Sequence, residues 1–236
     1  MKVSPRHVPS ARSRRAAALK VLAALCLSLL PATLPAQYLK LKLGGGLATQ
    51  YGDARAVGAY KIGVGYEYEF DQHWTVTPSL LFYGKGWKNR DVPVPLTDDD
   101  GNAVLDESGE QVYSLMSRST SANYVEVPVL FSYYHRLGES RYLVFAAGPY
   151  AALGVFGKVK TKGDTGRTGG EKYYYDANTF GSGGMRRFDA GVQALVGYQF
   201  PSGLTLGLEA DFGMVRTSSD GGRNLTGLVS LSYKFD

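Results

Sequence analysis

One polar segment concentrates carboxylates at a spacing that could bind a divalent cation. Residues 97–110 read "TDDDGNAVLDESGE". Aligned through its first glycine with the calcium loop of an EF-hand, the segment places Asp98, Asp100 and Glu107 at ligand positions. The first ligand position, however, holds Leu96, and no helical pattern flanks the segment. A β-hairpin with Asp-Gly turn chemistry explains these residues better, so we predict no metal site, and cation binding by this loop stays an open alternative.

Histidine, the commonest general base in enzymes, is rare in this chain. After residue 36 only His73 and His135 occur, both in short connectors between predicted strands. Small membrane barrels that hydrolyse or transfer acyl groups have a catalytic histidine near the outer leaflet, at the other end of the strands. No G-x-S-x-G nucleophile motif is present, and the only cysteine is Cys26. We therefore predict no catalytic residues, no cofactor and no enzymatic activity.

Charged residues also recur at alternate positions of otherwise apolar segments. In "AYKIGVGYEYEF", residues 59–70, large apolar side chains alternate with Lys61, Glu67, Glu69 and small residues. Because successive side chains of a β-strand point to opposite faces, this segment predicts a strand with one apolar and one polar face. Along the chain, the polar faces of such strands carry these charged residues: Lys40, Lys42, Lys61, Glu67, Glu69, Lys85, Glu126, Asp189, Glu209, Asp211 and Lys234.

Eight segments of this kind follow residue 36, and helical periodicity of any length is absent from the sequence. The segments are residues 38–48, 58–70, 74–87, 123–134, 142–157, 187–200, 204–214 and 224–235. The connectors "DQH", "HRLGESR" and "PSG" are tight, whereas residues 88–122 and 158–186 are long. Short turns at one end, long loops at the other and an even strand number are typical of outer-membrane barrels. The sequence thus predicts an all-β fold: an eight-stranded antiparallel up-and-down transmembrane β-barrel with short periplasmic turns and long extracellular loops.

Side-chain volume decides which face points into the barrel. Eight strands enclose a lumen that side chains just fill. The apolar face of residues 58–70 alone carries four aromatic residues, and residues 187–200 and 224–235 have similarly bulky faces. The opposite faces are rich in glycine, serine and threonine, and all 30 glycines lie after residue 36. The apolar faces must therefore point outward, to lipid.

Aromatic residues gather near the turn ends of the strands, as in the girdles of membrane barrels. They are Tyr66, Tyr68, Trp74, Tyr133, Tyr142, Tyr198, Phe200, Tyr233 and Phe235.

Pro78, Pro128 and Pro149 fall inside three consecutive strands, where a proline removes a ladder hydrogen bond. We predict local β-bulges at these three positions.

Residues 1–36 have the layout of a cleaved secretory signal peptide. A basic stretch precedes the apolar run "VLAALCLSLL", which is too short to span about 30 Å of hydrocarbon. Ala36 and Gln37 flank the predicted cleavage site, so residues 37–236 form the predicted barrel domain. The leader holds six of the 26 basic residues and none of the 21 acidic ones. The leader therefore accounts for the net charge of +5, because the rest of the chain has 20 basic and 21 acidic residues. The remaining, nearly neutral chain gives no support for nucleic-acid binding.

The predicted antiparallel order brings the inward charges together in two groups. The group near the periplasmic end comprises Lys40, Lys42, Glu67 and Glu69; the group nearer the loops comprises Lys61, Lys85, Glu126, Asp189 and Asp211. Buried charges without partners are very costly, so we expect ion pairs that fill the lumen. A narrow path for an ion or solute is the alternative.

The long loop at residues 158–186 mixes basic residues, glycines and the aromatic run Tyr173, Tyr174 and Tyr175. One interpretation is a surface loop whose lysines and arginines face outer-membrane lipid and anionic lipopolysaccharide. The other is a site for a sugar or protein that stacks on the tyrosines, because exposed aromatic residues favour interfaces. The sequence names no envelope protein partner.

The motifs "VTPSLLFYGKGW", "YVEVPVLFSYY", "GPY", "FDAGVQALVGYQF" and "LEADFGMV" occur in this order. Together they resemble the outer-membrane β-barrel domain of Bacteroidota porin-like proteins, the group that includes the secretion component PorT. The resemblance implies a barrel inserted by the outer-membrane assembly machinery, although Asp236 follows Phe235 where such barrels usually end on an aromatic residue. We expect an integral outer-membrane protein with a structural or loop-mediated binding role. A narrow porin-like channel and a subunit of an envelope export or secretion complex are the alternatives.

Overall fold

A computed structural model describes the chain after the predicted leader. The described residues are 37–52, 54–98, 100, 102–164, 172–181, 184–218 and 221–235. The predicted signal peptide, including Ala36, lies outside them, whereas Gln37 is the first residue of the first strand. Among the described residues, no helix is long and apolar enough to cross a membrane.

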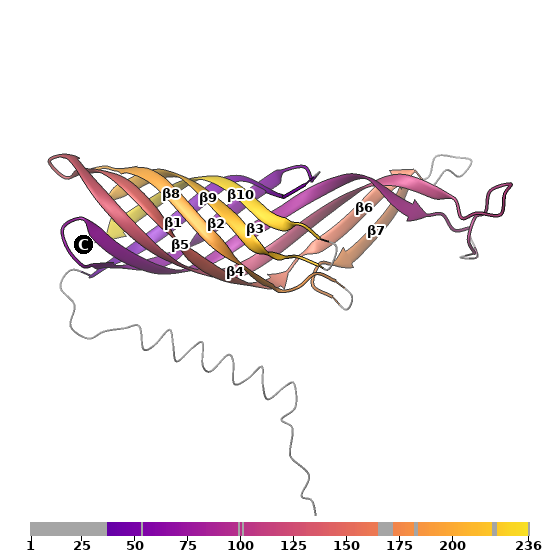
Figure 1. Ribbon diagram of the computed structural model, residues 1–236, viewed down its shortest axis with the longest axis horizontal. Helices are drawn as coiled ribbons and strands as arrows, with labels where there is room; N and C mark the ends of the chain where they lie inside the picture. The colour runs from indigo at the N-terminus through magenta and orange to yellow at the C-terminus, as the bar shows by residue number, and fades with distance from the viewer. Residues whose placement is uncertain are drawn as a thin grey trace, which may run out of the picture. The chain divides into compact units, whose positions relative to one another are not determined.

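The described residues form ten β-strands, eight of which close into a ring (Figure 1). The strands are β1 (Gln37–Gln50), β2 (Val57–Glu69), β3 (Trp74–Pro95), β4 (Tyr113–Gly138), β5 (Arg141–Phe156), β6 (Lys158–Asp164), β7 (Lys172–Asn178), β8 (Phe188–Gln199), β9 (Leu204–Arg216) and β10 (Arg223–Phe235). Every neighbouring pair is antiparallel, β1 pairs with both β2 and β10, and the β3–β4 pairing completes the ring. The predicted eight-stranded antiparallel barrel is confirmed.

Alternate side chains divide into an exposed apolar set and a buried polar set, as predicted. In β2, Tyr60, Ile62 and Val64 are exposed, whereas Lys61 and Glu67 are buried. The inward set includes many small hydroxyl side chains, which fit a narrow lumen. Those buried are Thr75, Thr77, Thr120, Ser132, Thr205, Thr226 and Ser230. The volume of the outward residues, and not the alternation itself, predicted this orientation.

The aromatic residues at the turn end form contacting pairs on the outer surface, with two exceptions. The ring centroids of Tyr198 and Phe200 lie 4.8 Å apart, as do those of Tyr233 and Phe235. Tyr68 is only 6% exposed and packs edge-on against Tyr66, with ring centroids 5.0 Å apart. Tyr142 lies on the inner side and packs against Tyr134, so its predicted place in the girdle was wrong.

The predicted bulges at the three prolines were also wrong. The pairing register of β3 with β4, and of β4 with β5, is the same on both sides of Pro78 and Pro128. Pro149 pairs with Val192 in the continuous register of β5 and β8. The ladder omits pairs beside Pro78 and Pro128 and then resumes, so these lost hydrogen bonds do not force an extra residue into the strands. The register shifts occur near strand ends, at Asn89/Val92 and Arg223/Leu225 among others.

The long loops build a sheet that continues beyond the barrel. β3 and β4 extend past their predicted limits and remain paired as far as Pro95 and Tyr113. The β6–β7 hairpin adds to the β4 edge through residues 117–120 (Figure 1). The hairpin predicted for residues 97–110 is found in the pairing of Thr97 with Ala103 and of Leu105 with Gln111, while Asp99 and Gly101 of the predicted turn lie outside the described residues. At its tip, the Asp98 carboxylate accepts hydrogen bonds from the Asp100 and Asn102 backbone N–H groups rather than facing a common centre.

Candidate functional site

The lumen carries a chain of ion pairs supplied by the inward positions of the strands. At the turn end, Lys40 pairs with Glu67, and the Tyr134 hydroxyl accepts a hydrogen bond from Lys40 at 2.8 Å while donating to Glu67 at 2.7 Å. Lys234 Nζ lies 2.6 Å from Glu69 Oε1 and 3.4 Å from Glu67 Oε1. This layer, named the lower layer here, contains three of the four residues that the sequence grouped together.

Lys42, the fourth, points away from that layer. Its Nζ lies 2.5 Å from Oε2 of Glu209 on β9. In the register of β1 with β2, Lys42 lies opposite Gly63, so no carboxylate of β2 is beside it. The expected pairing of Lys42 with Glu67 or Glu69 is therefore not found.

The upper layer, nearer the loops, centres on two fully buried lysines. Lys61 contacts Glu209, lies 3.1 Å from Asp211 Oδ2 and lies 3.3 Å from Glu126 Oε1. Lys85 lies 3.0 Å from Glu126 Oε2 and 3.3 Å from Asp189 Oδ2. The structure thus brings together the five residues that the sequence placed in this group, and it adds Glu209 and Lys42.

Tyrosine side chains, which the sequence did not predict there, share the lumen with these charges. The ammonium groups of Lys61 and Lys85 lie 4.2 and 4.5 Å from the Tyr83 ring centroid, within cation–π distance. Lys85 also lies 4.6 Å from the Tyr150 ring. Tyr83 shares the inward phase of Lys85 and could have been found from it, whereas residues 142–157 hold no charged residue that would mark the inward phase of Tyr150.

A residue of the second long loop closes the loop end of the lumen. Phe180 is only 7% exposed and packs edge-on against Tyr124, with ring centroids 5.6 Å apart. Arg187 holds it from outside, since its guanidinium donates to the Phe180 and Gly154 carbonyl oxygens at 3.2 and 2.8 Å. Nothing in the sequence distinguished Phe180 from other residues of this glycine-rich loop.

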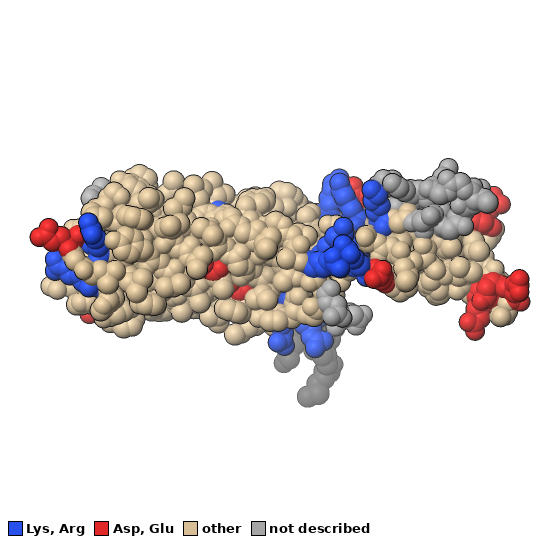
Figure 2. Space-filling model, turned by 90° about the horizontal axis from the view of Figure 1, so that it is seen from above, with Lys and Arg blue, Asp and Glu red and all other residues tan. Residues whose placement is uncertain are grey.

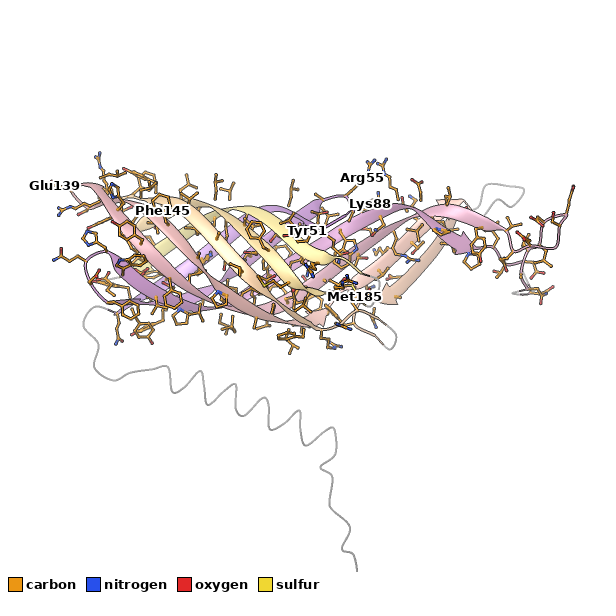
Figure 3. The ribbon with its side chains drawn as sticks, in the orientation of Figure 1. Tyr51, Arg55, Lys88, Glu139, Phe145 and Met185 are labelled. Atoms are coloured by element: carbon orange, nitrogen blue, oxygen red, sulfur yellow. The ribbon has the colours of Figure 1, made fainter. Side chains whose placement is uncertain are left out.

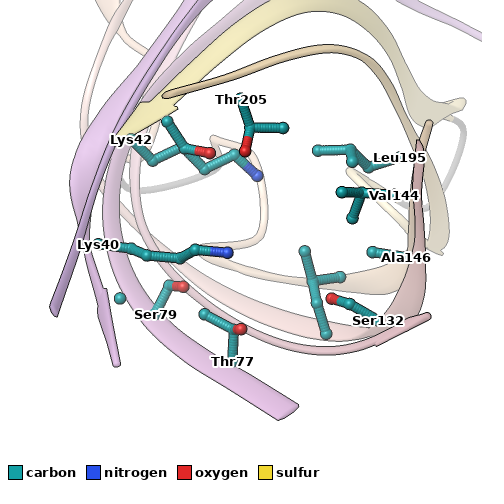
Figure 4. A pocket seen from close by; sticks show the side chains of 12 residues that line it. Lys40, Lys42, Thr77, Ser79, Ser132, Val144, Ala146, Leu195 and Thr205 are labelled. Carbon is teal, nitrogen blue, oxygen red and sulfur yellow. The ribbon is translucent and has the colours of Figure 1, made fainter. Parts of the chain in front are cut away.

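Little open space is left between the layers. A cavity of about 50 Å³ lies between Lys40 and Lys42, lined by small side chains such as Thr77, Ser132 and Ala146 (Figure 4). A wider vestibule of about 450 Å³ opens at the turn end and includes Glu69, His73, Tyr134, Arg136 and Lys234 in its lining. Tyr134 and Lys40 of the lower layer separate the vestibule from the cavity.

Comparison with known proteins agrees with this architecture. A family described as "Outer membrane protein beta-barrel domain" matches residues 39–217. The chain belongs to this family. Its place is accordingly the outer membrane, with the apolar outer face of the barrel in lipid. No curated protein sequence is significantly similar to the chain.

Two solved structures are similar to the chain at low sequence identity. Neisserial surface protein A has a TM-score of 0.40 at 9% identity, over 84% of this chain and 95% of that one. Ail, the attachment invasion locus protein of Yersinia pestis, has a TM-score of 0.36 at 14% identity, over 84% and 97%. That Ail structure holds the heparin analogue sucrose octasulfate.

The remaining predicted residues lie apart from the lumen. His73 is in the turn after β2 and stacks on Tyr133, whereas His135 lies within β4, since β4 continues to Gly138. The side chains of Tyr173, Tyr174 and Tyr175 lie outside the described residues, although their backbone forms β7. Among the described side chains, no group of three or more His, Cys, Asp or Glu residues is arranged to hold a metal ion.

Proposed function

We propose that this protein is a non-conducting outer-membrane barrel whose task is to hold an extracellular sheet that binds a protein partner. The observation that carries the proposal is an apolar patch on that sheet, beyond the barrel. Cross-strand pairs join Pro93 to Leu115 and Pro95 to Tyr113, and these four side chains are exposed. Leu115 and Tyr113 are 65% and 57% exposed, although this part of the chain extends past the lipid-facing strands.

Exposed apolar patches of this kind mark interaction sites, and tyrosine is enriched at protein interfaces. Figure 2 shows uncharged surface between basic residues near the mouth of the barrel and acidic residues at the far tip. Along the chain, the patch residues Pro93 and Pro95 lie between the basic residues Lys88 and Arg90 and the acidic residues Asp98 and Asp100. An apolar centre with a polar rim is the usual anatomy of a protein interface.

The tip beyond the patch is held in one conformation by its own hydrogen bonds. Backbone N–H groups of Leu96, Val104 and Val112 donate to one another's carbonyl oxygens at 2.9 to 3.0 Å. The Gln111 side-chain amide donates to the carbonyl oxygens of the same three residues at 2.8 to 3.3 Å. A preorganised surface loses less conformational entropy when a partner binds.

The filled lumen supports the non-conducting part of the proposal. The two layers of buried ion pairs and the Phe180 side chain lie across the lumen, and the cavity between the layers holds about 50 Å³. The proposal includes no catalytic role. It includes export by the leader and insertion by the assembly machinery through the terminal strand.

Site-specific cross-linking on intact cells tests the proposal. The photoreactive residue benzoylphenylalanine replaces Tyr113 in one variant and the lipid-facing Tyr60 in a matched control. We expect a protein adduct from position 113 that Leu115→Ser reduces, and none from position 60. Adducts that contain only glycan, or none at all, would contradict the proposal. Heat-dependent gel mobility shows that each variant is folded.

A role in an envelope export complex, as the PorT-like resemblance suggests, is the second candidate. The polar vestibule favours it, because it faces the turn end and offers carboxylates, Arg136, Lys234 and His73 to a periplasmic partner. Purification in detergent with the same photoreactive residue at Gln72 tests it: co-purifying envelope proteins cross-linked there support this candidate, and a chain always recovered alone removes it. Planar-bilayer recording tests the channel alternative, for which we expect no conductance above background.

A further inference from the structure

Two pairs of like-charged residues lie directly opposite each other at the loop end of the barrel. Arg216, the last residue of β9, pairs with Arg223, the first residue of β10. Arg55 and Lys88 pair in the same way, with backbone N–H···O hydrogen bonds of 2.7 and 3.0 Å (Figure 3). Like charges directly opposite in a sheet are destabilising, so each pair calls for a compensating anion.

The side chains of the arginine pair continue the lipid-facing phase of their strands. Phe212 and Met214 precede Arg216 at alternate positions and are exposed, and the half-buried Leu225 follows Arg223 at the next alternate position. From Leu204 to Met214 the chain rises about 25 Å along the barrel axis, using about 3.3 Å per residue and a tilt near 40°. This is the height of the apolar band, so both guanidinium groups lie at the level of the lipid headgroups.

A groove of about 720 Å³ joins the arginines to the apolar surface below them. It is lined by Tyr51, Phe212, Met214, Arg216, Arg223 and neighbouring glycines. The Tyr51 backbone N–H donates to the Arg223 carbonyl oxygen at 3.0 Å, and the exposed Tyr51 side chain lines the groove. A polar end and an apolar floor match an amphiphile rather than a free ion.

The guanidinium groups of this pair are not engaged by any described residue. Among the described residues, neither Arg216 nor Arg223 has a side-chain hydrogen bond or an ion pair. Other arginines of the loop side are engaged: Arg187 donates to backbone carbonyl oxygens and Arg118 to Thr161. Arg187 and Arg118 thus stabilise the loops, whereas the guanidinium groups of Arg216 and Arg223 form an open anion site.

We infer that Arg216 and Arg223 bind a phosphate group of an outer-leaflet lipid, with an acyl chain of that lipid lying on Met214 and Phe212. Guanidinium groups bind phosphate through paired hydrogen bonds, which a lysine cannot reproduce. Phosphate between the two arginines would also remove their mutual repulsion. The inference goes beyond the proposed protein-binding role, and it concerns the barrel rim rather than the extension.

Binding of phosphorylated lipid A to the folded barrel in detergent, followed by native mass spectrometry, tests the inference. We expect the double variant Arg216→Gln/Arg223→Gln to bind about tenfold more weakly than the wild type, a difference of about 1.4 kcal/mol. The matched control Arg136→Gln/Arg141→Gln removes the same charge at the turn end and should bind as the wild type does. Arg216→Lys/Arg223→Lys should fall between the two, because it keeps charge but not paired hydrogen bonds.

Two further ligands separate the sources of phosphate. Dephosphorylated lipid A should bind the wild type as weakly as phosphorylated lipid A binds the glutamine variant, and inorganic phosphate should not compete at equal concentration. Equal binding of both forms of lipid A, or of the wild type and the glutamine variant, would overturn the inference. Competition by inorganic phosphate would reduce the site to one for the free anion and overturn the lipid assignment. Both glutamine variants must retain the heat-dependent gel mobility of a folded barrel.

Discussion

Lys85 and Glu126 form an ion pair inside the barrel, with Lys85 Nζ 3.0 Å from Glu126 Oε2 and both side chains almost completely buried. The other oxygen of Glu126 lies 3.3 Å from Lys61 Nζ, so one carboxylate serves two buried ammonium groups. Glu126 is on β4, the strand whose pairing with β3 closes the ring. The same residue therefore joins the two lysines. A barrel that used this space for conduction would have to break these contacts.

Replacing Glu126 with glutamine should destabilise the barrel. Removing one partner of a buried ion pair leaves its counterpart uncompensated, so we expect the free energy of unfolding to fall by about 3 kcal/mol. Urea titration in liposomes, followed by tryptophan fluorescence, measures the change. Lys158→Ala is the control: it breaks an exposed pair with Asp176, 3.2 Å apart, and should change the free energy of unfolding by less than about 1 kcal/mol. Equal effects of the two variants would refute the special role of Glu126.

Removing the Phe180 ring should loosen the loop without unfolding the barrel. Phe180→Ala deletes the group that packs on Tyr124, so hydrogen exchange of the Thr179 and Met185 amides should accelerate by on the order of tenfold. Gly154→Val should act in the same way, because a Cβ at Gly154 would overlap the Phe180 ring. Unchanged exchange in both variants would show that the ring does not hold the loop.

Gly45→Val is the matched control for that experiment. A Cβ at Gly45 meets no atom within 4 Å, and the added side chain would face outward beside Tyr60 and Ile62. We expect wild-type exchange at Thr179 and Met185 in this variant. Accelerated exchange there would mean that the effect of Gly154→Val is a general consequence of adding bulk to the barrel.

The lower layer should control access from the vestibule to the small cavity. Ser132→Cys, in a chain that also carries Cys26→Ser, places a thiol at the cavity lining. It should react slowly with a charged thiol reagent, and Tyr134→Ala should increase the rate by on the order of tenfold because it removes the hydroxyl between Lys40 and Glu67. Tyr198→Ala, on the outer surface, should leave the rate unchanged. Fast labelling without Tyr134→Ala would mean that the layer does not close the cavity.

The tip of the β3–β4 extension should depend on Gln111. Gln111→Ala removes the amide that donates to three carbonyl oxygens, so hydrogen exchange at Leu96, Val104 and Val112 should accelerate while the barrel amides keep their protection. Gln72→Ala, in an exposed turn, should change neither region. If exchange at the tip stays slow in Gln111→Ala, the backbone hydrogen bonds alone hold the tip.

The turn between β2 and β3 should lose stability in acid. Hydrogen bonds from the His73 and Trp74 backbone N–H groups, 2.7 and 2.8 Å long, lower the pKa of Asp71 below its ordinary value of 3.8. The carboxylate therefore stabilises the fold above pH 3.8, and this contribution disappears as the pH falls through the lower, folded pKa. Asp71→Ala should be less stable than the wild type at neutral pH, and the difference should vanish in acid. A difference that does not depend on pH would contradict this account.

The sequence by itself determined the barrel and its inside. Alternation is a property of neighbouring residues, so the segments around Lys61 and Lys234 showed two faces without any knowledge of their partners. The volume of the aromatic residues then excluded the apolar face from a narrow lumen. The antiparallel order was also enough to bring Lys40 beside Glu67, because these residues lie on strands adjacent in the chain.

The tertiary structure decided the contacts that depend on closure of the ring and on the conformation of long side chains. Lys42 reaches Glu209 on a strand far away in the sequence, Phe180 folds back over the lumen, and Tyr142 turns inward. The pairing of Arg216 with Arg223 follows from a register shift at the start of β10. Strand alternation is encoded locally, whereas these contacts depend on how the strands are staggered around the barrel and on which distant group a flexible side chain meets. Local pattern therefore predicted the faces of each strand, and closure of the ring selected the partners.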